Sequence, residues 1–532
     1  MASDDHRVAD LLPSLQPPVS PQRPNIPTLP PRVIFTAPSQ DPSSSHKTQQ
    51  WISTTHVYPA AWPRSHVRSA KSDIYDAKIP STYSLGPLPS DPQAAKAEQR
   101  RRREADFAHW LEVCGGKDPE DQRNIMRSLR NSCLKSGHTA RITEARKANE
   151  VQLWNVVNRI VPASLDQEVT ASAANQDTRE GITLILAHAN GFHKEIFEPA
   201  VAALIKKLQT EAVRGKYRID EIWLFDCTHS GQAASINRNV LGDIVSWADH
   251  PRDMIKFLEN YLPETPSHPS APPAWLPTFL PSHKALLPNS KRRLVGLGHS
   301  FGGASLTFVV HARPGMLEGL ILVDPAIPQC DNEERFQFHN LPNEVWPALD
   351  QVPLSRGAIA RKDTFDSLPD ARAYFESKPF FQAWDKRALD LHLRFGLRPS
   401  VVPLTRALAA DDLPDNDLKR TPLELSNTKW HEAAAFCTTW MGWWGRKGML
   451  ATNHGAWIGM VNMQNGFDNV SLATEIERLD RGISFTIKGN HLVAQENPEA
   501  LADALVDVLE AQSSPQKLKE EKLRRQVGKT KL

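Results

Sequence analysis

After about residue 151 the chain alternates short hydrophobic runs with segments that carry hydrophobic residues at helical spacing. The runs lack the apolar–polar alternation of a half-exposed strand, and helices should therefore cover them on both faces. These runs lie at 184–187, 222–225, 294–297 and 320–323. Between them, residues 197–208 and 245–262 predict amphipathic helices. The strand–helix order predicts an α/β fold with a doubly wound, mostly parallel sheet.

Composition separates this core from the rest of the chain. Pro and Ser are frequent near the N-terminus without hydrophobic periodicity, which predicts disorder there. The stretch before the last strand contains helical pieces with many Trp, Pro and Arg residues, as a lid would. The predicted segments are a disordered arm at 1–50, an N-terminal extension with a charged helical insertion at 51–150, a core at 151–329 and 456–512, a helical lid at 330–455 and a charged tail at 513–532.

The charge is nearly balanced, with 63 Lys plus Arg against 61 Asp plus Glu, so no basic field favours nucleic acid. Arg100–Arg103 sit among good helix formers without interleaved aromatic residues, which favours a solvated helix face over an RNA-binding patch or a nuclear import signal. The five cysteines show no CxxC spacing, and a reducing compartment is expected. No segment has the roughly 18 consecutive apolar residues of a membrane span, and the N-terminus does not resemble a signal peptide.

The hydrophobic run at 294–297 leads into Gly298-His299-Ser300-Phe301-Gly302 and then into a helical pattern. A nucleophile elbow needs this strand–turn–helix order, with small residues at Gly298 and Gly302 because the serine backbone is strained and a Cβ at either position would collide with the neighbouring turn. We therefore expect Ser300 to be a nucleophile. The helix N-terminus would direct the Phe301 N–H at a developing oxyanion.

A second donor for that oxyanion is expected in the loop after the run at 184–187. This loop reads His188-Ala-Asn190-Gly191-Phe-His193, where Gly191 permits a sharp turn and Asn190 or its neighbour presents an N–H. His188 and His193 resemble a metal pair, but no third ligand has suitable spacing, so no metal site is predicted. Asp226 ends another strand at the same edge and is expected to organise a loop.

The motifs HANGFHKEIFEP and GLGHSFGG resemble the α/β-hydrolase superfamily of serine hydrolases over roughly 150–512. They look most like the fungal branch that includes peroxisomal lipase-like hydrolases and hydrolases of toxin biosynthesis. The resemblance implies an α/β-hydrolase fold and esterase, lipase or thioesterase chemistry.

In that fold the general base follows the last strand, and His491 occupies such a position after the run at 483–487. Two aspartates are candidates for the acid that would hold this histidine. Asp324 follows the run at 320–323, whereas Asp468 follows a weaker candidate strand at 456–463. The alternative roles are a turn residue for Asp324 and a helix N-cap for Asp468. The Asn465-Gly-Phe-Asp468 segment departs from the clear strand–Gly–Asp pattern of many relatives.

The expected activity is that of a serine hydrolase, a lipase-like carboxylic ester hydrolase of EC 3.1.1 type, acting on an ester or thioester of a hydrophobic acyl group. No metal or organic cofactor is required. An acyltransferase or a carbon–carbon bond hydrolase would use the same residues, and a non-catalytic binding protein of this fold is the remaining alternative. The C-terminal Thr530-Lys531-Leu532 resembles a peroxisomal address read by an import receptor, and an ordinary frayed terminus is the competing interpretation.

Overall fold

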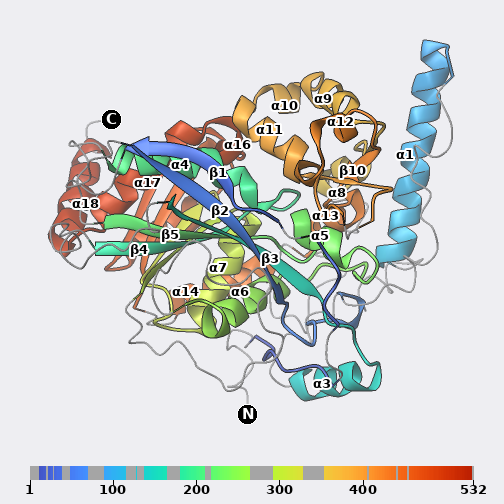
Figure 1. Ribbon diagram of the computed structural model, residues 1–532. Coiled ribbons are helices and arrows are strands. Elements are labelled where there is room, and N and C mark those ends of the chain that lie inside the picture. The colour runs from blue at the N-terminus through green and yellow to red at the C-terminus, as the bar shows by residue number, and fades with distance from the viewer. Residues whose placement is uncertain are drawn as a thin grey trace.

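The computed structural model describes residues 11–18, 22–27, 29–38, 48–69, 89–115, 128, 137–163, 180–209, 217–263, 292–327, 353–403, 406–438, 441–451 and 455–529. Within these residues a nine-stranded sheet crosses the protein in the order β1-β2-β3-β5-β4-β6-β7-β11-β12 (Figure 1). Its strands are β1 (Arg32–Pro38), β2 (Thr48–Pro59), β3 (Trp154–Pro162), β4 (Glu180–Ala187), β5 (Tyr217–Phe225), β6 (Arg293–His299), β7 (Gly319–Val323), β11 (Trp457–Asn465) and β12 (Gly482–Asn490).

The sheet is mostly parallel, as the sequence predicts. The strands from β5 to β12 pair in parallel, whereas β1, β2 and β3 pair antiparallel with each other and β3 pairs antiparallel with β5. The carboxyl ends of the parallel strands therefore meet at one edge, where this kind of sheet binds its ligands.

Helices cover both faces of the sheet. In Figure 1, α4 and α17 lie above it and α6, α7 and α14 lie below it. Leu184 and Leu186 of β4 pack with α4 and α17, while Ile185 and Ala187 pack with α6, α7, α14 and α15. This two-sided burial explains why the strands read as continuous hydrophobic runs. The helices are α4 (Glu198–Leu208), α6 (Asp249–Asn260), α7 (Phe301–Ala312), α14 (Met441–Ala451), α15 (Val470–Arg478) and α17 (Pro498–Ala511).

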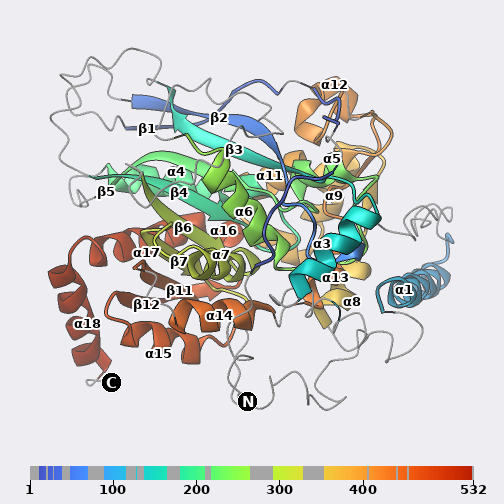
Figure 2. The same cartoon turned by 90° about the horizontal axis from the view of Figure 1, so that it is seen from below.

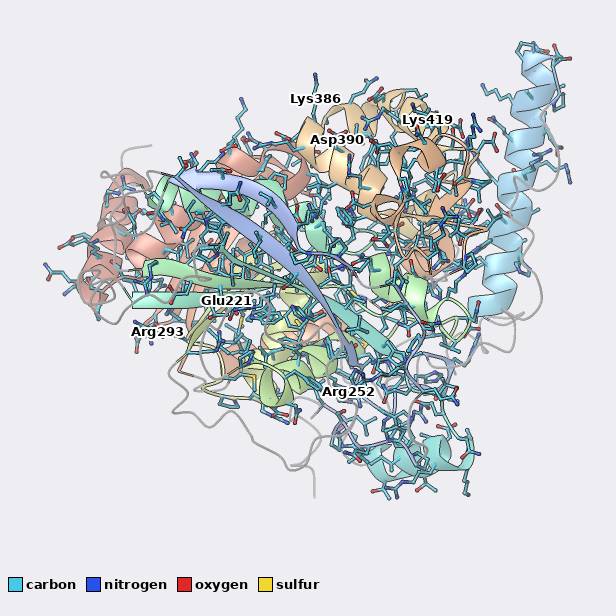
Figure 3. All side chains as sticks on the ribbon, viewed as in Figure 1. Glu221, Arg252, Arg293, Lys386, Asp390 and Lys419 are labelled. Carbon is cyan, nitrogen blue, oxygen red and sulfur yellow. The ribbon has the colours of Figure 1, made fainter. Side chains whose placement is uncertain are left out.

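A cap with its own three-stranded sheet, β8-β10-β9, lies at the carboxyl edge of the main sheet. The side chain of Asn190, after β4, donates to the carbonyl of Glu432 in the cap at 3.0 Å. Lys386, Asp390 and Lys419 lie on its outer side (Figure 3). The cap contains α8 (Pro353–Ile359), β8 (Thr364–Phe365), α9 (Leu368–Glu376), α10 (Pro379–Gln382), α11 (Lys386–Phe395), β9 (Leu397–Pro399), α12 (Asp415–Leu418), β10 (Leu423–Leu425) and α13 (Lys429–Phe436).

Two predicted boundaries differ from the structure. The arm expected to be disordered up to residue 50 contains β1 and the start of β2, which extend the main sheet. Arg32 of β1 donates to Glu198 of α4 at 3.0 Å, so a contact with a distant segment orders this strand where local periodicity is absent. The lid was expected to reach 455, but α14 packs on α7, where a Cβ on Gly445 would lie 2.0 Å from the Thr307 hydroxyl. α14 therefore belongs to the core.

One end of helix α1 (Pro92–Gly115) projects from the rest of the protein in both views (Figures 1 and 2). The other end packs on the cap, where Asp106 accepts from the Lys429 ammonium group at 2.8 Å and Trp110 is fully buried. Arg100 pairs with Glu104 on this helix, and Arg101 and Arg102 pair with Glu98. Arg100 and Arg101 are exposed, as on a solvated, ion-paired helix face, whereas Arg102 is buried. The remaining helices are α3 (His138–Lys147), α5 (Gly231–Asn237), α16 (Val493–Glu496) and α18 (Pro515–Lys529). In the described part of the chain, no helix is both long and apolar enough to cross a bilayer.

Candidate active site

The structure places Ser300 between β6 and α7, at the carboxyl edge of the sheet. Its backbone is strained, with φ 55° and ψ −117°. A Cβ on Gly298 would lie 2.5 Å from the Gly302 carbonyl oxygen, and one on Gly302 would lie 2.1 Å from that of Ala187. Both glycines are therefore required by close backbone approaches, the second of them to the neighbouring strand β4. This is the sharp strand-to-helix turn that exposes a nucleophile.

His491 connects this serine to a carboxylate. Its Nε2 lies 3.0 Å from the Ser300 hydroxyl, and its Nδ1 lies 2.6 Å from Oδ2 of Asp324. The three side chains come from the ends of β6, β7 and β12, separated by up to 191 positions in the sequence. They form one hydrogen-bonded series, in which the imidazole can accept the serine proton while the carboxylate fixes its tautomer.

The carboxylate of Asp324 is fully buried and held by the end of β11 and the turn after it. Its oxygens accept from the N–H of Met463 at 3.4 Å and of Phe467 at 3.1 Å. A Cβ on Gly466 would lie 2.3 Å from Asp324 Oδ2, so glycine is required for this approach. The ring of Phe467 also packs on His491, with centroids 4.2 Å apart. The Asn-Gly-Phe segment thus holds the acid that β7 supplies.

Asp468, the other candidate acid, is not brought to His491. It is exposed, and its Oδ1 accepts from the Val470 N–H at 3.4 Å, just before α15. Its contacts are those of a short turn before a helix.

His299 forms a hydrogen bond with the backbone of His491. Its Nε2 lies 2.7 Å from the carbonyl oxygen of His491 and donates a hydrogen bond to it. Burial, together with the nearby His491, lowers the pKa of His299 to about 3, so this imidazole stays neutral at physiological pH. It therefore orients the backbone of His491 without adding charge. The sequence indicated His299 only as part of the elbow.

Of the predicted oxyanion donors, Phe301 directly follows Ser300, and the loop that carries Asn190 and Gly191 begins next to the elbow, where a Cβ on Gly302 would lie 2.8 Å from the His188 carbonyl oxygen. Phe301 is the first residue of α7, so its N–H has no acceptor within the helix. Gly191 has φ 86°, and a Cβ there would lie 2.9 Å from the Glu432 carboxylate. With the amide of Asn427 oriented to present its oxygen, the Gly191 N–H donates to it at 3.3 Å. Asn190, one position earlier, is buried and anchored to the cap through its side chain.

A buried ion network fixes the base of this loop, and the sequence analysis missed its cation, Lys194. The ammonium group donates to Asp226 and Gln232, both at 2.9 Å, and pairs with Glu195 at 2.9 Å. Burial alone would lower the pKa of Lys194, but the two carboxylates outweigh it and raise the pKa, so the side chain is charged. Asp226 also accepts from the Lys194 N–H at 3.0 Å. The sequence contained a signal for the pair Lys194–Asp226, because each residue closely follows a strand that ends at the same edge of the sheet.

His188 and His193 are buried but separately engaged. Nδ1 of His188 lies 2.7 Å from the Ala189 carbonyl oxygen, and Nδ1 of His193 lies 3.1 Å from Glu195. Across the described ranges, no group of three or more His, Cys, Asp or Glu side chains is arranged to hold a metal ion.

A family model described as the alpha/beta hydrolase family matches residues 184–504, which is more than half of the chain. The chain therefore belongs to the alpha/beta hydrolase family, as its motifs suggest. Among curated proteins it is similar to the type I acyl-CoA thioesterases mpaH of Penicillium roqueforti (strain FM164), with 24% identity over 312 residues, and of Penicillium brevicompactum, with 24% over 311 residues. Each alignment covers 53% of this chain and 60% of the relative.

Two solved structures are similar to this chain at low sequence identity. The peroxisomal alpha-beta-hydrolase Lpx1 from Saccharomyces cerevisiae is 16% identical, with a TM-score of 0.46, and the match covers 72% of this chain and 92% of that chain. The thioesterase domain from the curacin biosynthetic pathway is 10% identical, with a TM-score of 0.37, and the match covers 66% and 95%.

Proposed function

We propose that this protein is a serine hydrolase that cleaves an ester or thioester of a hydrophobic acyl group through an acyl-enzyme. One observation carries the proposal: the continuous hydrogen-bonded series Ser300–His491–Asp324, with the serine on a strained elbow. A hydroxyl is a weak nucleophile at neutral pH, and this arrangement supplies the base that it needs.

In the proposed reaction, His491 takes the proton of Ser300 as its hydroxyl oxygen attacks the carbonyl carbon. The oxyanion accepts hydrogen bonds from the N–H of Phe301 and of Asn190, since the Gly191 N–H is engaged by Asn427. His491 then protonates the leaving group. A water molecule, deprotonated by the same imidazole, attacks the acyl-enzyme and releases the acid, while Asp324 stabilises the transient imidazolium.

The substrate class is supported by the curated relatives, which are named acyl-CoA thioesterases. Aromatic side chains of the cap pack mainly on each other. Phe375 and Phe381 have ring centroids 4.6 Å apart, and Phe381 and Trp384 have centroids 5.0 Å apart. Core packing therefore accounts for these residues, and the thioester assignment rests on the relatives.

The test is labelling with a fluorophosphonate probe together with hydrolysis of a chain-length series of p-nitrophenyl esters and acyl-CoA thioesters. We expect labelling of the wild type and its loss in Ser300→Ala, with kcat/KM lowered on the order of 10⁴-fold or more. Ser305→Ala is the matched control, because this buried serine lies on the same helix and donates to the Phe301 carbonyl at 2.9 Å. Equal labelling of wild type and Ser300→Ala, or no labelling of either, would refute the proposal and favour a binding protein.

The peroxisomal location remains a proposal from the sequence. It rests on Thr530, Lys531 and Leu532, which lie outside the described residues. A fluorescent protein fused in front of the last twelve or so residues should reach peroxisomes, and removal of the final tripeptide should leave it dispersed.

A further inference from the structure

A small cavity lies against Phe301, the residue that follows Ser300. Its wall combines the loop after β5, the segment leading into α6 and helix α13 of the cap. The cavity has a volume of about 20 Å³, which is room for a polar group of about one or two heavy atoms. An alkyl chain does not fit into this space. The lining includes Cys227, His229, Val245, His250, Phe301 and His431.

Two of the imidazoles in this wall have unused hydrogen-bonding atoms. Both ring nitrogens of His250 and the Nε2 of His229 have no hydrogen-bond partner among the described residues, although each side chain is more than nine-tenths buried. His431 differs, since its nitrogens lie 2.9 Å from the Thr428 hydroxyl and 2.8 Å from the Gly242 carbonyl. A buried polar atom without a partner is costly. The cavity therefore contains groups that a ligand can complete.

The cavity offers hydrogen bonds without an uncompensated charge. Arg64 in its wall binds Asp253 at 2.7 Å and lies 3.4 Å from Asp249, and Arg252 binds Asp249 at 2.7 Å. The two positive charges of these guanidinium groups are balanced by the two negative charges of the carboxylates. Burial is the main cause that moves the pKa of His229 and of His250 well below the ordinary value, and Arg64 contributes to both shifts. Each ring is thus neutral, with one nitrogen that donates and one that accepts.

The cavity is also close to the reacting centre. The ring of Phe301 stacks on His250, with centroids 5.5 Å apart and planes inclined by 18°. The backbone N–H of the same phenylalanine is the proposed oxyanion donor. The cavity therefore adjoins a residue that contributes to the candidate reacting centre.

We propose that the cavity is a specificity subsite in which His250 and His229 bind a hydroxyl group on the acyl part of the substrate. A hydroxyl donates and accepts, as the paired imidazole nitrogens require, and it fits the available space. A carboxylate or ammonium group would enter a neutral, buried site unpaired, and the cavity disfavours both. This proposal rests on the proposed function and narrows its substrate class to hydroxyacyl esters or thioesters.

The experiment compares hydrolysis of octanoyl-CoA with that of hydroxyoctanoyl-CoA isomers that carry the hydroxyl at different carbons. For at least one isomer we expect kcat/KM to exceed that of octanoyl-CoA by about tenfold. In His250→Phe this preference, expressed as the ratio of the two kcat/KM values, should fall to about one. His392→Phe is the matched control, because it removes another buried imidazole, located in the cap, and should keep the preference.

Three outcomes would overturn the subsite. The first is an equal kcat/KM of the wild type for octanoyl-CoA and every isomer. The second is a preference for a hydroxylated isomer that survives in folded His250→Phe. The third is a loss of this preference in His392→Phe as large as the loss in His250→Phe. Equal values in the wild type would mean that the cavity holds only structural water. If His250→Phe does not fold, His229→Phe provides the same comparison. Failure of the proposed function gives a different result, because octanoyl-CoA itself is then not hydrolysed or Ser300→Ala still hydrolyses it. In that case the proposed subsite is refuted as well.

Discussion

Asp324 and Asp468 show how two equivalent sequence positions acquire different environments. Both follow a strand, and both precede a turn, so the local sequence does not decide which of the two is the partner of His491. Only the fold brings the carboxylate of Asp324 to His491 and surrounds it with N–H donors from the end of β11 and the turn after it. That turn belongs to a strand far along the chain, and its Gly466 is needed for contact with an aspartate that sequence proximity does not reveal.

Asp324→Asn should therefore lower kcat by about 10⁴-fold, because an amide at this position favours the wrong tautomer of His491. Asp468→Asn is the matched control and should retain activity within about twofold, since its carboxylate is exposed and bonds only the nearby Val470 N–H in the described structure. Steady-state hydrolysis of one ester by both folded variants decides the question. A larger loss in Asp468→Asn would contradict the assignment.

At the scale of elements, the elbow depends on how closely α7 approaches β4. The Cβ that Gly302 lacks would occupy the space of the Ala187 carbonyl, which is held in the sheet. The flanking glycines were expected from the strained serine, but the identity of the obstructing strand follows only from the sheet order.

Gly302→Ala should lower the free energy of unfolding by about 3 kcal/mol or more, because backbone atoms of the sheet must move. Gly357→Ala is the control, since a Cβ on this exposed residue of α8 meets nothing within 4 Å. It should leave stability unchanged or raise it by up to about 1 kcal/mol. Urea denaturation measures both, and similar stabilities for the two variants would refute the steric argument.

The ion network below the oxyanion loop ties the segment after β4 to the segment after β5. Lys194→Met leaves the carboxylates of Asp226 and Glu195 buried without their cation, and should cost about 3–5 kcal/mol of stability. Lys207→Met removes a partner of an ion pair at the surface, Lys207–Asp503, and should cost less than about 1 kcal/mol. Denaturant unfolding of both variants provides the comparison, and an equally small effect at Lys194 would show that the network contributes little.

At the scale of the whole molecule, several histidines are buried as neutral imidazoles. Burial is the main cause that lowers the pKa of His188 and His431 to about 4 and of His299 to about 3, from an ordinary value of 6.5. Burial likewise moves the pKa of His392 well below 6.5. Between these values the unfolded chain binds protons that the folded chain does not, so acid favours unfolding.

The free energy of unfolding should therefore fall as the pH is lowered from 6.5 toward 4.5, by up to about 1.4 kcal/mol per pH unit for each such histidine. Stability from this source is fully present above pH 6.5. His392→Phe should reduce the slope by the contribution of one histidine. Urea unfolding at a series of pH values tests this, and an unchanged slope in that variant would contradict it.

The sequence by itself determined the strand runs, their order and the elbow around Ser300, because burial on both faces and backbone strain leave local patterns of residues. It also predicted that His491, the candidate base, follows the last strand, since the order of elements fixes that position. The tertiary structure decided which aspartate faces His491, that β1 joins the sheet and that α14 belongs to the core. It also decided that unpaired imidazoles meet beside Phe301. These features are contacts between residues far apart in the chain, and no local pattern encodes such contacts.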